Sequence, residues 1–437
     1  MRQLALVAAV VALIDVLGLA ACGGKESATK VGTGTASNLP PATPVASAGS
    51  ATAVTDPARP APAATKPPAE PTIGGHDFTA AAQVLLVVGA CGDGPQPQGF
   101  SAELIAKHCD VIEKTQQAYS DSWLSKARPF FAEKVPKDVP KKVVYPFAGG
   151  DLSTALTVYP DADEITTLSL EPAGDPRTLA ALNTPTKSGK PSAALQKALQ
   201  TVQYELRFLY KVNFSNTMNM IEAMRGGSLP TQLIFGLSAL KVHGYEVVAL
   251  RYFKLGEAGN IVYLTDDEVA NAPDAAGTAN AEKRNRLFAN AEVRFKKPGG
   301  HTQIYRHIQT NLDDKHIDAD RRVLAHLEQK GPIAGMTKAA SYLLSWDSFS
   351  QMRGYLATNV VWMVSDATGI APKWGKAAGF DYELYGSFGE PHIEAGNAIA
   401  KNWRDEFKAQ PRRALPFRFG YYDKKLVNHL VIMKRKS

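Results

Sequence analysis

The sequence predicts an α/β fold, in which a single three-layer domain with a mixed, partly parallel sheet follows a disordered tether. Three observations predict it. Lys141–Gly174 reads as one strand, turn, helix and strand unit, helices and strands alternate along the rest of the chain, and two hairpins add antiparallel strands. We expect the tether to end at residue 75 and one α/β domain to cover residues 76–437.

The first 21 residues have the pattern of a secretory signal peptide. One basic residue, Arg2, precedes an apolar run from Leu4 to Leu13, and small residues lead up to Cys22. The run is too short to span a bilayer, and small residues are typical of a cleavage site. Residues 1–21 are therefore expected to be removed on export, although Asp15 is unusual in such a segment.

The end of this leader carries a more specific motif. Leu19, Ala20, Ala21 and Cys22 resemble the lipobox of bacterial lipoproteins. The resemblance implies cleavage before Cys22 and acylation of this residue, so that membrane lipid is the expected partner. Because Gly23 follows instead of Asp, the resemblance also implies the outer membrane, facing the periplasm or the exterior. The alternative is an ordinary signal peptide in which Cys22 is incidental.

Residues 22–75 are expected to form the disordered tether. Lys25–Gly75 consists largely of Ala, Thr, Ser and Gly with nine of the chain's 28 prolines, and it has no aromatic residue. Such a segment buries too little apolar surface to offset the entropy that ordering costs. Its expected role is to hold the folded domain away from a lipid surface.

The charge and the cysteines indicate which kinds of partner and site the chain lacks. The net charge of +7 is dispersed, and the single basic cluster, Lys434–Lys436, lacks interleaved aromatic residues, so no nucleic-acid partner is expected. Besides Cys22 the chain has Cys91 and Cys109. In an oxidising compartment this pair is expected to form a disulfide. The spacing does not fit a Cys-x-x-Cys redox pair, and no metal site is expected.

The central unit is the best punctuated part of the chain. A β-branched strand, Val143–Phe147, is broken by Gly149-Gly150, and Asp151 is placed to cap a helix over Leu152–Val158. A second strand follows over Ile165–Leu170. Two strands joined by one helix are expected to be parallel, as in a doubly wound, Rossmann-like sheet.

The remaining elements follow from hydrophobic periodicity and turn residues. The predicted helices are Phe78–Val88, Ala102–Ser120 capped by Ser101, Ser192–Arg225 with a break near Asn213–Asn216, Leu229–Val242, Asp318–Gln329, Lys338–Trp346, Phe349–Leu356 and Ile393–Lys408. The predicted strands are Glu246–Lys254, Asn260–Leu264, Glu292–Lys297, His301–Gln309, Val360–Val364, Phe380–Tyr385, Phe417–Tyr421 and Asn428–Lys434.

A ligand site is expected where the parallel strands end. Glu171 follows the glycine turn at about the spacing at which a dinucleotide-binding fold holds a ribose hydroxyl. The three-glycine fingerprint is absent, however, and the Asp151 carboxylate would repel a phosphate at the helix N-terminus. The glycine turn and terminal acid look somewhat like the S-adenosylmethionine site of Rossmann-like methyltransferases. That donor is cytoplasmic whereas this chain is expected to be exported, so no cofactor is predicted.

The candidate ligand-binding residues are therefore Gly149, Gly150, Asp151, Glu171 and Asp366. Each also has a structural interpretation: Gly149, Gly150 and Asp366 form turns, Asp151 caps a helix, and Glu171 only ends a strand. Asp366 and the less favoured Glu390 belong to polar loops after predicted strands.

Several segments resemble, in the same order, an uncharacterised family of exported bacterial proteins. They are Tyr145–Asp151, Leu170–Pro172, Lys338–Leu343, Ser365–Ile370 and Leu384–Gly386. That family has Ser-Gly-Pro-Asp in place of Ala148–Asp151 and two Asp in place of Ser365-Asp366. The resemblance implies one domain with a Rossmann-like Tyr-Pro-Phe-x-Gly-x-Asp unit, and it implies no activity.

Two functions remain open at this stage, and the catalytic residues, if any, are unknown. One is a lipid-anchored extracytoplasmic protein with a binding or structural role at the cell envelope. The other is an enzyme or small-ligand receptor with a Rossmann-like pocket near Gly149, Asp151 and Glu171. No protein or small-molecule partner can be named from the sequence.

Overall fold

A computed structural model describes residues 73–184, 191–213, 229–275, 279–388, 396–420 and 428–436. The signal peptide, the lipobox, most of the tether, Glu390 and the predicted helical residues 214–225 and 393–395 lie outside these ranges. The strands are β1 (Lys142–Pro146), β2 (Glu164–Ser169), β3 (Glu246–Leu255), β4 (Ile261–Tyr263), β5 (Asn290–Lys296), β6 (Gln303–Gln309), β7 (Ile333–Thr337), β8 (Val360–Ser365), β9 (Phe380–Gly386) and β10 (His429–Arg435).

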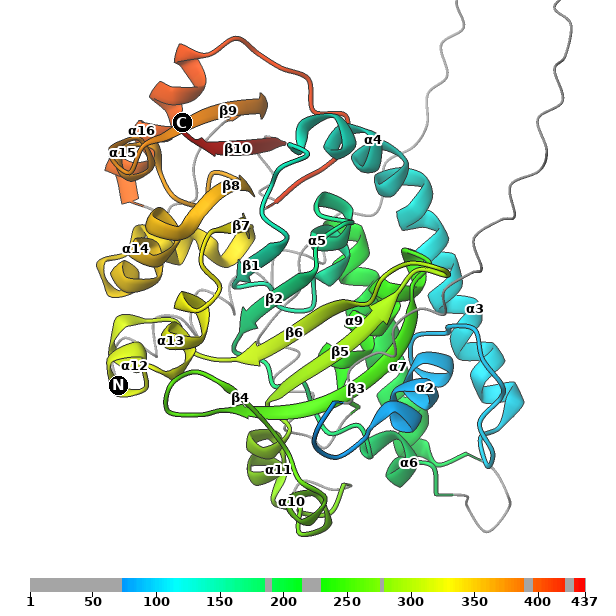
Figure 1. Ribbon diagram of the computed structural model, residues 1–437. Helices are drawn as coiled ribbons and strands as arrows, with labels where there is room; N and C mark the ends of the chain where they lie inside the picture. Colours follow the sequence, from blue (N-terminus) through cyan, green and yellow to red (C-terminus); the bar gives the residue numbers. More distant parts are fainter. Residues whose placement is uncertain are drawn as a thin grey trace, which may run out of the picture. The chain divides into compact units, whose positions relative to one another are not determined.

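The ten strands of the described residues belong to one sheet with the order β4-β3-β5-β6-β2-β1-β7-β8-β10-β9 (Figure 1). The central strands β6, β2, β1, β7 and β8 are parallel. Antiparallel strands flank them, with β5, β3 and β4 on one side and β10 and β9 on the other. The predicted mixed, partly parallel sheet is confirmed, as is the parallel pairing of β1 with β2.

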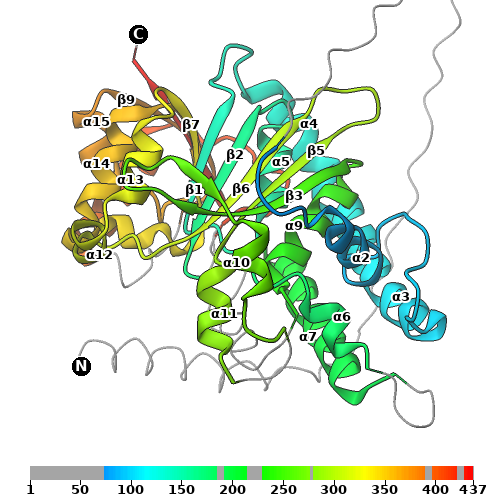
Figure 2. The same ribbon diagram turned by 60° about the horizontal axis from the view of Figure 1, so that its bottom comes forward.

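Helices cover both faces of the sheet, which makes three layers (Figure 1 and Figure 2). The first face is covered by α2 (Thr79–Val88), α3 (Ala102–Tyr119), α4 (Ser125–Lys134), α5 (Leu152–Val158), α7 (Ala193–Val212) and α9 (Thr231–Val242). The second face is covered by α12 (Asp314–Ala319), α13 (Arg322–Glu328), α14 (Ser350–Asn359), α15 (Pro372–Ala377) and α16 (Gly396–Ala409). The other α-helices of the described chain are α6 (Thr178–Leu182), α10 (Asp266–Ala270) and α11 (Ala281–Leu287).

The two faces of the sheet bury separate hydrophobic cores. In β1, Val143 and Tyr145 belong to the core of the first face, whereas Val144 belongs to that of the second. This alternation follows from the two-residue period of a strand. Both cores are filled at once because β1 lies in the middle of the sheet and is buried on both sides.

Cys91 and Cys109 form a disulfide, with a Cα–Cα distance of 5.4 Å. The bond joins the loop after α2 to α3, as the sequence predicted. The predicted cap of α3 is also present, since the Ser101 hydroxyl accepts a hydrogen bond from the Leu104 amide at 3.3 Å. Among the described residues, no helix combines the length and apolar character that crossing a bilayer requires.

Two of the predicted elements are broken by polar side chains that bind the backbone. The helix predicted over Asp318–Gln329 is interrupted, because the Asp320 side chain accepts hydrogen bonds from the amide and the guanidinium of Arg322, where a second helix begins. Within the predicted strand Phe417–Tyr421, residues 417–420 are irregular. There the Asn428 side chain bonds to the Phe417 carbonyl and the Phe419 amide, in place of a neighbouring strand.

The helix predicted over Lys338–Trp346 is a third expectation that was wrong. It follows β7, a strand that the sequence did not predict. The segment Ala339–Ser345 is a 3-10 helix rather than an α-helix over Lys338–Trp346. Lys338 itself has extended backbone and lies directly after β7. The strand is short and has Gly335 in its middle, which weakens its strand pattern. Its position between β1 and β8 fixes where Lys338 lies.

Candidate functional site

The predicted ligand-binding residues come together at one edge of the sheet. Gly149, Gly150 and Asp151 follow β1, Glu171 follows β2 and Asp366 follows β8. Because these strands are parallel and β7 alone separates β1 from β8, their carboxyl ends lie at the same edge. We call this the carboxyl edge. The structure adds Lys338, which follows β7 and was not among the predicted residues.

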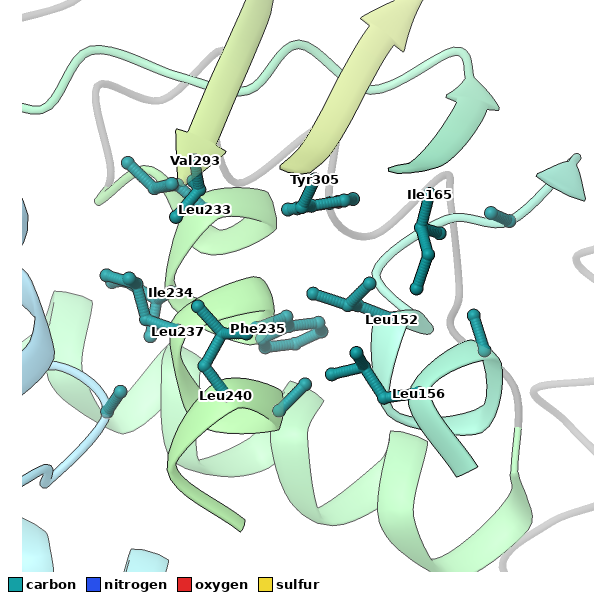
Figure 3. Packing of buried hydrophobic residues seen from close by; sticks show 14 of the residues in the cluster. Leu152, Leu156, Ile165, Leu233, Ile234, Phe235, Leu237, Leu240, Val293 and Tyr305 are labelled. Atoms are coloured by element: carbon teal, nitrogen blue, oxygen red, sulfur yellow. The ribbon is translucent and has the colours of Figure 1, made fainter. Parts of the chain in front are cut away.

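The glycine turn brings α5 close to α9. Gly149 adopts a left-handed backbone conformation, with φ of 51°. A Cβ atom on Gly150 would overlap the Phe235 side chain of α9. Figure 3 shows the Phe235 ring packed toward Leu152 and Leu156 of α5. The contacts described for the two glycines are therefore those of a tight turn and a close helix contact.

Asp151 caps α5, as predicted. Its Oδ1 accepts hydrogen bonds from the Thr154 amide at 3.3 Å and from the Thr154 hydroxyl at 2.8 Å. Its Oδ2 accepts one from the Tyr145 hydroxyl at 3.1 Å. Burial raises the pKa of Tyr145 well above its usual value, and the neighbouring Asp151 charge acts in the same direction. The tyrosine is therefore a neutral donor to the carboxylate.

Lys338 forms a buried ion pair with Asp151. Its side chain is 1% exposed and that of Asp151 is 3% exposed. The ammonium also donates to the Thr154 hydroxyl at 3.0 Å and to Asn213 Oδ1 at 3.2 Å, and it lies 5.6 Å from the centre of the Phe419 ring. Burial lowers the pKa of Lys338, and the Asp151 carboxylate opposes that effect. Three oxygen atoms therefore surround the ammonium, which uses all of its donors.

The Asp366 carboxylate binds backbone amides in the two loops that follow β7 and β8. One oxygen, Oδ2, accepts a hydrogen bond from the Ala339 amide at 3.0 Å, and the other, Oδ1, accepts one from the Thr368 amide at 3.0 Å. Asp366 is completely buried, and Gly420 approaches it so closely that a Cβ there would overlap the carboxylate. The Asp366 charge also acts on both Lys338 and Tyr145.

Glu171 is also completely buried. Its backbone carbonyl accepts a hydrogen bond from His307 Nε2 at 2.7 Å. The other ring nitrogen, Nδ1, lies 3.0 Å from the Gln232 amide nitrogen, which can only donate, so the proton resides on Nε2. Burial lowers the pKa of His307 to about 4, which keeps the ring neutral. Burial in the first core raises the pKa of Tyr305 to about 12, and the charge of Glu171 acts in the same direction.

Two residues at the carboxyl edge have strained backbone. Phe147 follows β1 with φ of 58°, and Ala339 follows β7 with φ of 56°. For residues other than glycine such conformations cost about 1 to 3 kcal/mol, and they concentrate at ligand and active sites. Both residues lie next to the buried ion pair in the chain, since Ala339 follows Lys338 and Phe147 lies in the turn that leads to Asp151.

A serine and a histidine also meet near this turn. Ser153 Oγ lies 3.1 Å from His243 Nε2 and donates to the Tyr119 hydroxyl at 3.2 Å. The Arg128 guanidinium approaches Nδ1 of the same ring at 3.4 Å. Because Arg128 can only donate, Nδ1 is the acceptor and Nε2 carries the proton. His243 then cannot remove a proton from Ser153, so the contact is not an activated nucleophile.

The carboxyl edge combines three buried carboxylates, those of Asp151, Glu171 and Asp366, with the ammonium of Lys338. This charge balance favours a cationic or hydroxyl-rich ligand over a phosphate. Within the described ranges, no group of three or more His, Cys, Asp or Glu side chains is arranged to hold a metal ion. The described contacts of Asp151 and Asp366 are to the protein's own backbone and side chains, as in the structural interpretation of these residues.

Lys338 was missed because its place depends on a strand that the sequence did not predict. Its partner Thr154 is 184 residues away in the chain, so no local pattern links the two. One signal in the sequence could have indicated Lys338. It is the first charged residue after the short apolar run of β7, just as Asp366 is the first charged residue after β8.

Comparison with models of protein families, with curated proteins and with solved structures found no match to this chain.

Proposed function

We propose that this chain is an exported, lipid-anchored protein of the cell envelope, and that its α/β domain has a binding or structural role there. The lipobox-like segment that ends at Cys22 motivates the proposal, and the Cys91–Cys109 disulfide is the observation that carries it. Disulfides persist in oxidising compartments and are rare in the cytosol. The disulfide uses the other two cysteines, which leaves Cys22 for acylation.

The proposal for a role without catalysis is supported by the carboxyl edge. Asp151 and Lys338 pair with each other, and Asp366 accepts hydrogen bonds from backbone amides. A carboxylate engaged in this way positions the turn and the loops after β7 and β8. Breaking these contacts to perform acid or base chemistry would leave a buried charge without compensation.

The anchor is tested by labelling full-length protein with a radioactive fatty acid in a bacterium that processes lipoproteins. We expect label in the wild type and none in Cys22→Ala. The matched control is the double variant Cys91→Ala/Cys109→Ala, which should lose the disulfide and keep the label. An intact leader, or a free Cys22 thiol at the mature N-terminus, would show the proposal to be wrong.

A second function, an enzyme or receptor with a Rossmann-like, methyltransferase-like site at the carboxyl edge, is favoured by one observation. The strained backbone at Phe147 and Ala339 flanks the buried Asp151–Lys338 pair on two adjacent strands. Strain of this kind persists only where the surroundings enforce it, and it often accompanies ligand binding.

The second function is tested by thermal unfolding of the full chain in the presence of nucleosides, sugars and divalent metals. A ligand of this edge raises the melting temperature by mass action, by a free energy of about 2.7 kcal/mol at about 100 times its dissociation constant. Asp366→Asn keeps a hydrogen-bond acceptor but removes the charge, so it should reduce the shift. Asp405→Asn, at an exposed carboxylate on α16, should not. The absence of any shift, or equal shifts in both variants, would count against this function.

A further inference from the structure

A pocket of about 800 Å³ lies at the opposite edge of the sheet from the Asp151–Lys338 pair. Its lining includes Lys141, which precedes β1, and Pro160–Ala162, which precede β2. The pocket is therefore at the amino ends of the parallel strands, and we call it the amino-edge pocket. Its other walls come from α4 and the chain after it, from the end of α5, from the turn between α9 and β3, and from the β5–β6 hairpin.

The floor of the amino-edge pocket is apolar. Val135 and Val139, from the chain after α4, and Val242, at the end of α9, line it with partly exposed side chains, and Phe131, Leu156 and Val158, which also line it, are buried in the first core. Around the floor stand four cations, which are Arg128, Lys137, Lys141 and Lys297. One carboxylate, Asp161, faces them, so three positive charges are in excess.

The positive charges are not neutralised by the protein. Within the part of the chain that the structure describes, none of the four cations forms an ion pair with a carboxylate. The second face of the same edge is different: there Glu164 pairs with Arg306 and Lys330, and Glu292 pairs with Arg306. The fold thus pairs the largely buried cations Arg306 and Lys330 on one face, whereas the four cations around the amino-edge pocket are exposed and are accessible to a ligand.

Two of the cations are held in position by neutral groups. The Arg128 guanidinium donates to the Val242 carbonyl at 3.3 Å and approaches His243 Nδ1 at 3.4 Å. Both contacts use Nη2, and a guanidinium has five donors in all, so most of them face other directions. The Lys297 ammonium lies 5.0 Å from the centre of the Tyr245 ring. These contacts fix the two charges beside the pocket without reducing them.

The pKa of His243 reflects the positive charges of Arg128 and Lys297. Burial, together with the charges of Arg128 and Lys297, lowers the pKa of this histidine to about 3. The ring is therefore neutral and adds no charge of its own. A group that the surrounding cations help to keep unprotonated marks a region of positive potential, which attracts anions.

We propose that the amino-edge pocket binds an organic phosphate monoester with an apolar body, whose phosphate contacts Arg128 and Lys297 while its apolar body contacts the partly exposed side chains of Val135 and Val139. Three positive charges in excess favour a dianion over a single carboxylate, and arginine and lysine are the residues that bind phosphate. The volume is in the range of small-molecule sites, which combine an apolar lining with a few polar groups. This site does not depend on the proposed lipid anchor.

The binding is tested by calorimetric titration of phenyl phosphate into the purified full chain, in phosphatidylcholine nanodiscs if the chain carries lipid and in buffer if it does not. We expect saturable binding at one site. Inorganic phosphate lacks the apolar body and benzyl alcohol lacks the charge, so each should bind at least about tenfold more weakly.

Variants assign the binding to this pocket. Arg128→Gln and Lys297→Gln should each weaken the binding of phenyl phosphate by about fivefold or more, because each removes a charged hydrogen bond to the anion. The matched control is Lys126→Gln, which removes the same charge from the exposed surface of α4, outside the pocket lining. It should change the affinity by less than about twofold.

Three results would overturn the proposal. They are no binding of phenyl phosphate, equal weakening by Lys126→Gln and Arg128→Gln, and binding of inorganic phosphate or benzyl alcohol as tight as that of phenyl phosphate. A competition with vesicles then distinguishes two sources of the same chemistry. Displacement of phenyl phosphate by vesicles that contain phosphatidic acid, but not by phosphatidylcholine vesicles, assigns a lipid headgroup, and failure to displace it assigns a soluble ligand.

Discussion

At the scale of single residues, the buried ammonium of Lys338 depends on several partners at once. Asp151 supplies the opposite charge, and the oxygens of Thr154 and Asn213 accept its remaining hydrogen bonds. A buried ion pair of this kind adds little net stability, but removing one partner leaves the other charge buried alone.

Lys338→Met is therefore expected to lower the free energy of unfolding by about 3 to 5 kcal/mol. The double variant Lys338→Met/Asp151→Asn should be less destabilised than Lys338→Met, because the lone carboxylate is gone and Asn still caps α5. Urea unfolding at neutral pH measures both. A double variant as unstable as the sum of the two single variants would contradict this account.

Glu164 illustrates a charge that the fold stabilises. Burial alone would raise its pKa, but the adjacent charges of Lys330 and Arg306 outweigh burial and lower the pKa to about 2. Since the folded pKa lies below the usual value of 4.5, the stabilisation is fully present above about pH 4.5 and is lost as the pH falls toward 2.

The expected consequence is a pH-dependent effect of Glu164→Gln. At neutral pH the variant should be less stable than the wild type by up to about 3 kcal/mol, and the difference should vanish as the pH approaches about 2. Denaturant unfolding at a series of pH values measures it. Glu282→Gln, which breaks an exposed pair with Arg286, serves as the control and should differ from the wild type only slightly at every pH.

At the scale of elements, the strand–turn–helix unit was readable from sequence because its signals are local. Gly149 and Gly150 break the strand, Asp151 caps the helix, and apolar runs on both sides supply the strands. The strand β7 was not readable, since its identity comes from its neighbours: it lies between β1 and β8 and is buried at every position. Tertiary burial there outweighs a weak local pattern.

The turn between β1 and α5 offers a direct test. Gly150→Ala places a methyl group into the Phe235 side chain of α9 and should lower the free energy of unfolding by about 1 to 3 kcal/mol. Gly354→Ala in α14 is the matched control, because no heavy atom other than those of the adjacent helix backbone and its chain neighbours lies within 4 Å of its added Cβ. In a helix interior that change should leave stability the same or raise it by up to about 1 kcal/mol. Equal losses in the two variants would refute the close contact.

The disulfide is a further feature at this scale. It closes a loop with a sequence separation of 18 and ties the segment after α2 to α3. By the chain-entropy estimate, a loop of this length contributes about 3 kcal/mol. Replacing Cys91 and Cys109 together by serine should therefore lower the melting temperature of the domain while its far-UV circular dichroism spectrum at room temperature stays the same. An unchanged melting temperature would show that the bond adds nothing to stability.

For the whole molecule, three buried histidines distributed over the fold also contribute to acid stability. Burial is the first cause of a lowered pKa in each: about 3 for His243, about 4 for His307 and about 4 for His326. The unfolded chain therefore takes up these protons first as the pH falls below the ordinary value of 6.5. Stability is retained above pH 6.5 and is lost as the pH falls from there toward about 4.

We expect the free energy of unfolding to decrease by as much as about 4 kcal/mol per pH unit near about pH 5, if all three histidines contribute fully. Urea unfolding at neutral pH and at two mildly acidic values, about pH 6 and about pH 5, measures the slope. Stability that stays constant across this range would mean that the folded and unfolded chains take up these protons equally, so that folding does not lower the pKa of the three histidines.

The fold class was predictable as a whole because helices and strands alternate along the chain. The predicted site residues also meet at one edge, since parallel strands end together. Contacts between distant segments could not be predicted from the sequence. Arg128 contacts His243, and Lys297 contacts Tyr245, only after the sheet has assembled. The amino-edge pocket is made of such contacts, so no motif marks it.

The place of β10 has a consequence for synthesis. This strand is made after the other nine, yet it lies between β8 and β9 and is the strand with which β9 pairs in the described sheet. While the nascent chain is still growing, β9 lacks this neighbour, and the sheet is completed only when the ribosome has passed residue 435. A chain interrupted before β10 therefore exposes a strand edge that invites aggregation.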